Sequence, residues 1–139
     1  MPAELFVDTS GWYPAVVAGT PDHPRVAQAL SDRVRQGVRI VTTNLVVAET
    51  HALLLRRVGR APALEFVRRV GESPNLVVAS GPDIEGLAVR DWLTRFDDQD
   101  LSLTDAVSFT VMRQRGMREV LGLDRHFGVA GFVLVPSQP

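Results

Sequence analysis

Two residue types are absent from this sequence of 139 residues: cysteine and lysine. Without cysteine there can be no disulfide, no thiolate zinc site and no cysteine nucleophile, so any bound metal has oxygen or imidazole ligands. All 15 basic residues are arginine. P-loop nucleotide-binding proteins need the lysine of their phosphate-binding loop, and Schiff-base enzymes need a lysine amine. Both classes are therefore excluded.

Long apolar runs and a strong net charge are also missing. No run approaches the roughly 18 apolar residues of a membrane-spanning helix, and the N-terminus lacks the pattern of a secretory signal. We therefore expect a cytoplasmic protein without a membrane partner. The net charge of −1 gives no global basic field, although it does not exclude nucleic acid as a ligand. The length and the 45% hydrophobic content are typical of one globular domain, which we expect over residues 1–139.

Short apolar runs alternate with helical patterns along the chain. Strands are predicted at 5–7, 38–41, 76–79, 120–123 and 132–135, and helices at 24–36, from 43 or 44 to 58, at 62–70, at 82–96, and from 102 or 104 to about 115. Strands that alternate with helices predict a parallel sheet covered on both faces, the three-layer α/β fold. Such sheets bind ligands at the carboxyl ends of their strands.

Two acids directly follow predicted strands. Asp8 comes after the apolar run 5–7, and Asp124 comes after the run 120–123. Each has a simpler explanation: Asp8 as a helix cap, and Asp124 as a turn residue or the partner of the neighbouring arginine. Both still lie at the sheet edge where α/β folds bind ligands.

A third acid, Glu49, lies within a predicted helix. Its apolar stripe is predicted to be Leu45, Ala48, Ala52 and Leu53. Glu49 is four residues from both Leu45 and Leu53, so the pattern places it on the apolar face. A buried carboxylate must be paired or neutralised, and a buried ion pair is the alternative explanation.

The fourth acid, Asp105, shares a predicted helical face with Phe109 and Met112. Stabilisation by the positive end of the helix dipole is its alternative explanation. Four carboxylates at one sheet edge repel one another unless they are protonated or bind a cation. Magnesium and manganese prefer oxygen ligands and also bind phosphate oxygens, so the four acids together indicate metal-dependent phosphodiester chemistry.

Four segments of the sequence resemble the PIN-domain family, and within it the VapC-like toxin ribonucleases. They are LFVDTSGWYP at 5–14, TTNLVVAETHALL at 42–54, LSLTDAVSFTVM at 101–112 and GLDRHFGVAGF at 122–132. The resemblance implies a five-stranded parallel sheet flanked by helices. It also implies a Mg²⁺- or Mn²⁺-dependent endoribonuclease that cleaves single-stranded RNA, forms a homodimer, and is the toxin of a type II pair with a small antitoxin.

The resemblance also assigns residues. It implies that the catalytic acids are Asp8, Glu49, Asp105 and Asp124, with Asp8 and Asp105 as metal ligands and the other two as further candidates. Ser10 is similar to a hydroxyl residue that helps to orient metal or phosphate. Asn44 stands near a position that often carries a polar residue facing the site. Gly122 departs from the family, because relatives often have Thr or Ser there, and we expect a local hydroxyl contact to be absent.

An RNA substrate needs cations beside this acidic centre, because phosphate contacts position the strand. The candidates are Arg56, Arg57 and Arg60, with a solvated surface as the alternative. Trp12 and Tyr13 could stack on a base, although burial is the stronger interpretation for at least one of them. His51 and His126 lack zinc-motif spacing and are predicted to be structural.

Two other functions remain open. An aspartyl-phosphate phosphatase would use Asp8 as nucleophile, but position 10 is Ser rather than an acid and there is no supporting lysine. A non-catalytic module that binds RNA or protein is supported only by Gly122.

Overall fold

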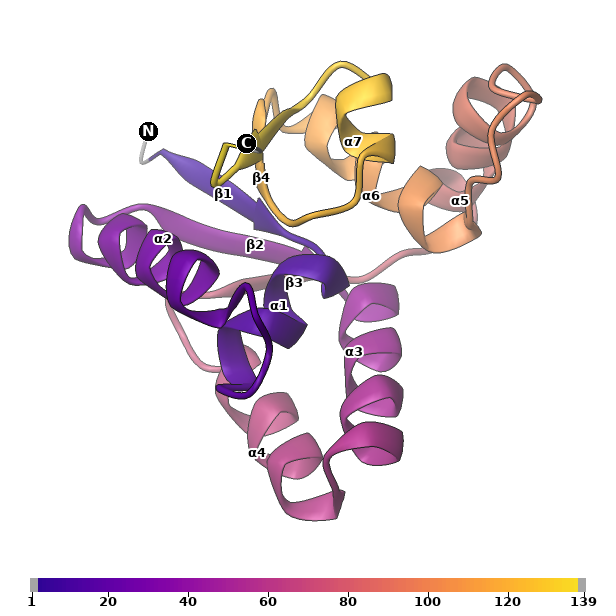
Figure 1. Ribbon diagram of the computed structural model, residues 1–139. Coiled ribbons are helices and arrows are strands. Elements are labelled where there is room, and N and C mark those ends of the chain that lie inside the picture. Colours follow the sequence, from indigo (N-terminus) through magenta and orange to yellow (C-terminus); the bar gives the residue numbers. More distant parts are fainter. Residues whose placement is uncertain (1–2, 138–139) are drawn as a thin grey trace.

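Five short strands form a sheet at the centre of the molecule (Figure 1), in a computed structural model that describes residues 3–137. They are β1 (Glu4–Val7), β2 (Arg39–Thr43), β3 (Leu76–Val78), β4 (Glu119–Leu121) and β5 (Val133–Val135). Their order across the sheet is β3-β2-β1-β4-β5, and all neighbouring strands are parallel. The predicted five-stranded parallel sheet is confirmed.

Helices cover the sheet in two groups, which Figure 1 shows below and above it. The first group is α1 (Thr9–Val16), α2 (His23–Arg35), α3 (Asn44–Arg57) and α4 (Arg60–Val70), and the second is α5 (Pro82–Ala88), the π-helical turn η1 (Val89–Leu93), α6 (Leu103–Gln114) and α7 (His126–Val129). Right-handed crossovers place the groups on opposite faces, because the chain adds β2 and β3 on one side of β1 and then β4 and β5 on the other. The strand order thus reverses between β1 and β4, where such sheets bind ligands. None of the helices within residues 3–137 is long and apolar enough to cross a membrane.

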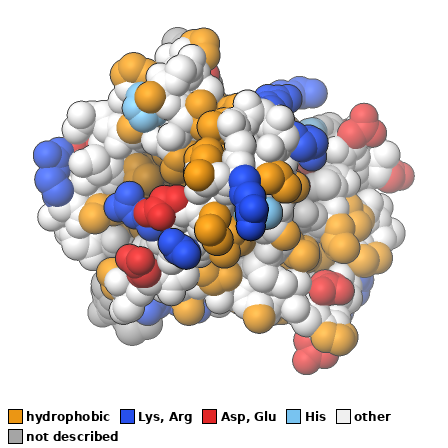
Figure 2. Space-filling model, turned by 90° about the horizontal axis from the view of Figure 1, so that it is seen from below, with side chains coloured by type: hydrophobic (Ala, Val, Ile, Leu, Met, Phe, Trp, Pro, Cys, Tyr) orange, Lys and Arg blue, Asp and Glu red, His pale blue; other side chains and the backbone are white. Residues whose placement is uncertain are grey.

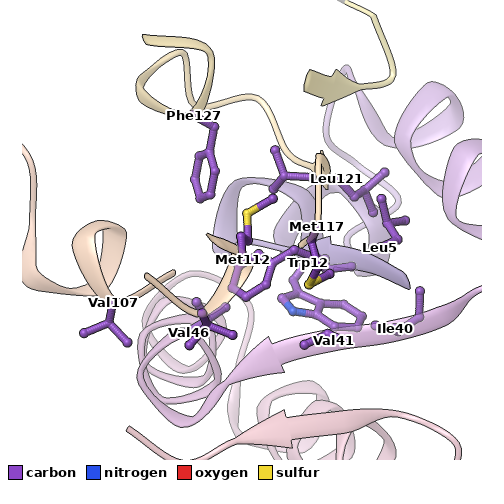
Figure 3. Packing of buried hydrophobic residues seen from close by; sticks show 14 of the residues in the cluster. Leu5, Trp12, Ile40, Val41, Val46, Val107, Met112, Met117, Leu121 and Phe127 are labelled. Atoms are coloured by element: carbon purple, nitrogen blue, oxygen red, sulfur yellow. The ribbon is translucent and has the colours of Figure 1, made fainter. Parts of the chain in front are cut away.

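The core lies on both faces of β1. Residues 5–7 of this central strand are completely buried. On one face, Trp12 of α1 packs edge-on against Phe66 of α4, with ring centroids 5.4 Å apart. On the other face, Phe109 of α6 packs edge-on against Phe127 of α7, with centroids 4.9 Å apart. Figure 3 shows part of this cluster from close by. The tight packing fixes the carboxyl ends of β1 and β4 relative to each other.

The helix α3 does not bury the stripe that its sequence predicts. Its buried residues are Val46, Thr50 and Leu54, whereas Ala48 and Glu49 are exposed. The reason is that apolar residues occur on several faces of this helix, so the pattern alone does not fix its rotation. Thr43 fixes the start by accepting a hydrogen bond from the Val46 amide at 3.2 Å. The prediction of a buried Glu49 is therefore wrong.

Two further elements differ from the predicted helices. The helix expected at 82–96 is α-helical only to Ala88 and then continues as the π-helical η1, which buries Trp92. The segment after Asp124 was not predicted to be helical, yet residues 126–129 form α7 and bury Phe127. In both places the segment that differs buries an aromatic side chain in the core.

The face made by α1 to α4 carries apolar side chains at the surface. Val16, Val34 and Val58 are about half exposed and line a groove whose floor includes Trp12 and Phe66. Figure 2, which views the molecule from below, shows apolar side chains gathered among acidic and basic ones. This groove is separate from the cavity at the carboxyl ends of the strands.

Candidate metal centre

Asp8 connects β1 to α1. It has an extended backbone and is the N-cap of α1, and its Oδ2 atom accepts a hydrogen bond from the Ser10 amide at 3.2 Å. The simpler explanation of Asp8 as a helix cap is therefore correct. Its carboxyl group is nevertheless buried, with only 4% of the residue exposed, and it lines a cavity of about 500 Å³. A cap that is also buried beside a cavity has a further oxygen available to a ligand.

Ser10 links the end of β1 to the loop after β4. Its hydroxyl donates to Asp8 Oδ2 at 2.8 Å and accepts from the amides of Leu123 at 2.9 Å and Asp124 at 3.2 Å. A Cβ atom on Gly122 would lie 2.8 Å from Ser10 Oγ. Position 122 itself supplies no hydroxyl, as expected, but the Ser10 hydroxyl occupies the space beside Gly122 and contacts the Asp124 amide. Without a Cβ, Gly122 leaves room for the hydroxyl of Ser10.

Asp105 lies in the first turn of α6. Ser102 Oγ accepts from the Asp105 amide at 3.0 Å, and Asp105 Oδ2 accepts from the Ser102 amide at 3.4 Å. This reciprocal capping agrees with the explanation that a first-turn acid stabilises the helix. It also holds the carboxyl group over the cavity that Asp8 lines.

Glu49 reaches the same cavity from α3, but from its exposed face. Within residues 3–137 it forms no ion pair with a basic residue, so the alternative of a buried pair does not apply. Its position one helical turn before Leu53, which also lines the cavity, places the carboxylate on the solvent side of the site. Glu49 thus reaches the other acids from the exposed face of α3, not from the buried face that the pattern predicts.

Asp124 follows β4 and is held by the start of α7. Its Oδ1 accepts from the His126 amide at 2.9 Å, and His126 Nδ1 lies 3.1 Å from the same oxygen. One ligand atom each from Asp105, Asp124 and His126 lies within 4.8 Å of the others. His126 is predicted to be structural, because it lacks zinc-motif spacing. Spacing in the sequence does not show that a tight turn places its ring beside Asp124.

Burial, with a smaller contribution from neighbouring charges, raises the pKa values of two acids in this cavity. Burial raises the pKa of Asp8 from 3.8 to about 7, the hydrogen bonds from Ser10 oppose this rise, and the charges of Asp105 and Asp124 add to it. Burial also raises the pKa of Asp105, with further contributions from Asp124 and Glu49. The described part of the chain places no arginine in ion-pair contact with these acids.

These residues fit a divalent cation. The carboxylate oxygens of Asp8, Asp105 and Asp124 form a donor set suited to Mg²⁺ or Mn²⁺, and the buried Asp8 gains a counter-charge when such an ion binds. Asp8 and Asp105 approach the cavity from opposite sides, with Asp124 between the strand end and α7. A cation there would offset the burial and the repulsion that raise the two pKa values.

The comparison with known families agrees with this geometry. A family model for the PIN domain matches residues 5–133. This chain belongs to the PIN domain family. It is 34% identical over 131 residues to the 23S rRNA-specific endonuclease VapC20 of Mycobacterium tuberculosis, a match that covers 94% of this chain and 97% of that protein. It is 28% identical to Ribonuclease VapC26 of the same organism, over 95% of this chain and 100% of that protein.

Solved PIN-like structures have the same fold. The crystal structure of Mycobacterium tuberculosis VapC20, described as a sarcin-ricin loop cleaving toxin, matches with a TM-score of 0.85 and 33% identity over 93% of this chain and 96% of that one. FitAcB from Neisseria gonorrhoeae matches with a TM-score of 0.66 at 14% identity, over 94% and 95% of the two chains. The second similarity concerns the fold alone.

The remaining predicted residues of this PIN domain do not line the cavity. Asn44 is exposed and does not line the cavity; its Oδ1 accepts from the Ser80 amide at 2.8 Å and ties α3 to the loop after β3. Arg56, Arg57 and Arg60 are exposed where α3 passes into α4. Of these three, Arg57 contacts a residue that lines the cavity, because its guanidinium lies over the Tyr13 ring.

Proposed function

We propose that this protein is a divalent-metal-dependent endoribonuclease and the toxin of a type II toxin–antitoxin pair. The observation that carries this proposal is the convergence of Asp8, Glu49, Asp105 and Asp124 on one cavity whose described lining residues include no arginine. Membership of the PIN domain family and the names of its relatives, an rRNA-specific endonuclease and a ribonuclease, support the activity.

Each acid has a distinct proposed role. Asp8 and Asp105 hold the metal ion, with Asp124 as a third carboxylate, and Ser10 keeps Asp8 oriented through its two hydrogen bonds. The ion, Mg²⁺ or Mn²⁺, would lower the pKa of an attacking water and neutralise charge on the phosphate. Glu49 stands on the solvent side, where its carboxylate can accept a proton from that water.

The partners follow from the same activity. We propose a small cognate antitoxin and a homodimeric assembly in the cytoplasm, where the RNA substrate is found. The description of VapC20 as a toxin supports an antitoxin partner, and the names of VapC20 and VapC26 as nucleases support an RNA substrate. The apolar groove beside α1, α2 and α4 is a second exposed surface, apart from the cavity, on which a protein partner could bind.

Cleavage of RNA by the purified protein tests the proposal. We expect cleavage with Mn²⁺ or Mg²⁺, none in excess chelator, and a loss of at least about 100-fold in rate for Asp8→Asn or Asp105→Asn. Asp83→Asn is the matched control, because Asp83 is an exposed acid of α5 away from the cavity. Full activity in chelator would contradict a metal mechanism.

The alternative of a non-catalytic module rests only on Gly122. The Ser10 hydroxyl lies beside that glycine and contacts the Asp124 amide, which supports a working site. Titration calorimetry with Mg²⁺ distinguishes the two functions, since a module without a working site has no reason to bind the ion. Covalent trapping of phosphate on Asp8 would be needed to support the phosphatase alternative.

A further inference from the structure

The cavity extends beyond the acids along two neighbouring helices. Besides the carboxylates it is lined by Tyr13 and Pro14 of α1 and by Leu53 of α3. These residues lie one helical turn beyond Ser10 and Glu49, on the same faces of their helices. The cavity therefore has an acidic end, and beyond it a part with an aromatic ring and apolar side chains, which Thr20, Pro21 and Asp22 also line.

Arg57 continues the stripe of α3. Glu49, Leu53 and Arg57 follow at four-residue spacing, so they share a face, and Arg57 lies about 12 Å along the helix from Glu49 at 1.5 Å per residue. Its guanidinium carbon is 5.8 Å from the centre of the Tyr13 ring, within cation–π distance. One helix face thus runs from a catalytic acid, past an apolar wall, to a positive charge.

Arg57 is available to an external anion. Among the described residues, acids form ion pairs with Arg25, Arg33, Arg35, Arg39, Arg90, Arg113 and Arg115. No acid within residues 3–137 pairs with Arg57. Tyr13 is only partly buried, whereas the neighbouring Trp12 is in the core, so Tyr13 is the aromatic ring of this segment that a ligand can reach.

We infer that Tyr13 and Arg57 form the binding subsite for a nucleotide next to the cleaved phosphodiester bond. The Tyr13 ring packs against the base, and the Arg57 guanidinium binds the phosphate of that nucleotide. Stacking on an aromatic ring tolerates any base, and a cation on the phosphate positions the strand. The inference rests on the proposed ribonuclease activity and adds the residues that hold the substrate. Without such a cation, the strand would meet carboxylates alone.

Binding of RNA without cleavage tests this subsite. The probe is a fluorescein-labelled single strand of about 12 nucleotides, within the range of single-strand site sizes, measured by anisotropy with Mn²⁺ in the Glu49→Gln background, which keeps the proposed metal ligands and lacks the proposed proton acceptor. We expect Tyr13→Leu to weaken binding about tenfold and Tyr13→Phe to retain it. Arg57→Gln should weaken binding and reduce the slope of log affinity against log salt by about 0.7, the value for one phosphate contact. Arg118→Gln is the control, because Arg118 precedes β4 at the opposite end of the strand.

A set of strands that each lack one base separates stacking from a structural effect. In the parent protein, loss of the base at one position should weaken binding about tenfold, and in Tyr13→Leu the same loss should have no further effect. If the ratio of the parent's affinity to that of Tyr13→Leu is the same for every abasic strand and for the intact strand, Tyr13 does not contact a base. If Arg57→Gln and Arg118→Gln have equal salt slopes, Arg57 does not bind a phosphate. Either result overturns the subsite.

Cleavage by the unsubstituted protein is measured in parallel, so that failures can be told apart. Absence of cleavage with Mn²⁺ would contradict the proposed function, whereas cleavage with unchanged KM in both Tyr13→Leu and Arg57→Gln would contradict only the subsite. If Tyr13→Leu does not fold, as shown by the loss of its thermal unfolding transition, Arg57→Gln alone decides the test. The Arg57 side chain is exposed and contributes little to the core.

Discussion

Asp8 is a single carboxyl group whose protonation depends on the fold. Its pKa is about 7 in the folded protein against an ordinary 3.8, chiefly because it is buried. Between these two values the folded chain keeps a proton that the unfolded chain has released. The free energy of unfolding of the metal-free protein should therefore fall as the pH rises through this window, by roughly 4 kcal/mol in all, and level off above about pH 7.

Asp8→Asn should remove this pH dependence. The amide keeps an oxygen that can accept from Ser10, so the variant should be more stable than the parent at pH 8 in chelator and gain little at pH 4. Urea denaturation at the two pH values measures the difference, with Asp83→Asn as the control. An equal change in stability at pH 4 and pH 8 would show that Asp8 is already ionised in the fold.

Ser10 and Gly122 should behave as a pair. The Ser10 hydroxyl is held by three polar groups, so it cannot swing away from a Cβ placed at position 122. Gly122→Ser should cost about 1–3 kcal/mol through overpacking and slow RNA cleavage. Ser10→Ala combined with Gly122→Ser should recover part of both losses, because residue 122 then supplies the hydroxyl from the loop after β4. Urea midpoints and cleavage rates that simply add in the double variant would refute the pairing.

The acids show how far residues could be predicted from their pattern. Asp8 and Asp124 lie where strand ends were predicted, because an apolar run followed by an acid is a local signal. Glu49 lies at the cavity for a reason that the pattern missed, since the rotation of α3 depends on contacts with other elements. Tyr13 and His126 have no local signal, because their places beside Arg57 and Asp124 come from tertiary contacts.

Among the elements, the sheet was easier to predict than the helix details. The five strands are short apolar runs bounded by polar or glycine residues, and each predicted run overlaps an observed strand. The end of α5 could not be predicted, because a helical pattern does not distinguish α from π winding. The helix α1 directly after Asp8 was not among the predicted helices, since a helix cap and a turn use the same residue types.

The contact between α1 and β4 gives a prediction at this scale. A Cβ atom on Gly11 would lie 2.2 Å from the backbone oxygen of Leu121, which cannot move without disturbing the sheet. Gly11→Ala should therefore lower the free energy of unfolding by about 3 kcal/mol or more. Gly86→Ala, in α5 with no atom within 4 Å of the added group, should instead raise it by about 0.5–1 kcal/mol. Urea denaturation compares the two, and a harmless Gly11→Ala would mean that α1 does not pack so closely.

For the whole molecule, charge is arranged locally rather than as a general field. The net charge is −1, and many arginines are neutralised by acids on the surface. The two features that remain are the acidic cavity and the arginine-rich passage from α3 to α4. A substrate with negative charge can approach this surface only when a cation balances the acids, so metal binding and RNA binding should be coupled.

Metal binding should also be visible in the stability of the entire fold. An ion that binds only the folded chain raises the free energy of unfolding by about 2.7 kcal/mol at one hundred times its Kd, or roughly 10 °C in Tm for a domain of this size. The gain from Mn²⁺ should be larger at pH 8 than at pH 5.5, because at the lower pH the ion must displace the proton on Asp8. Asp105→Asn should lose most of this gain and Asp83→Asn should keep it. Thermal scans with Mn²⁺ and with chelator measure both effects. An equal rise in Tm for the two variants would mean that the ion binds elsewhere, and the four acids would then need another explanation.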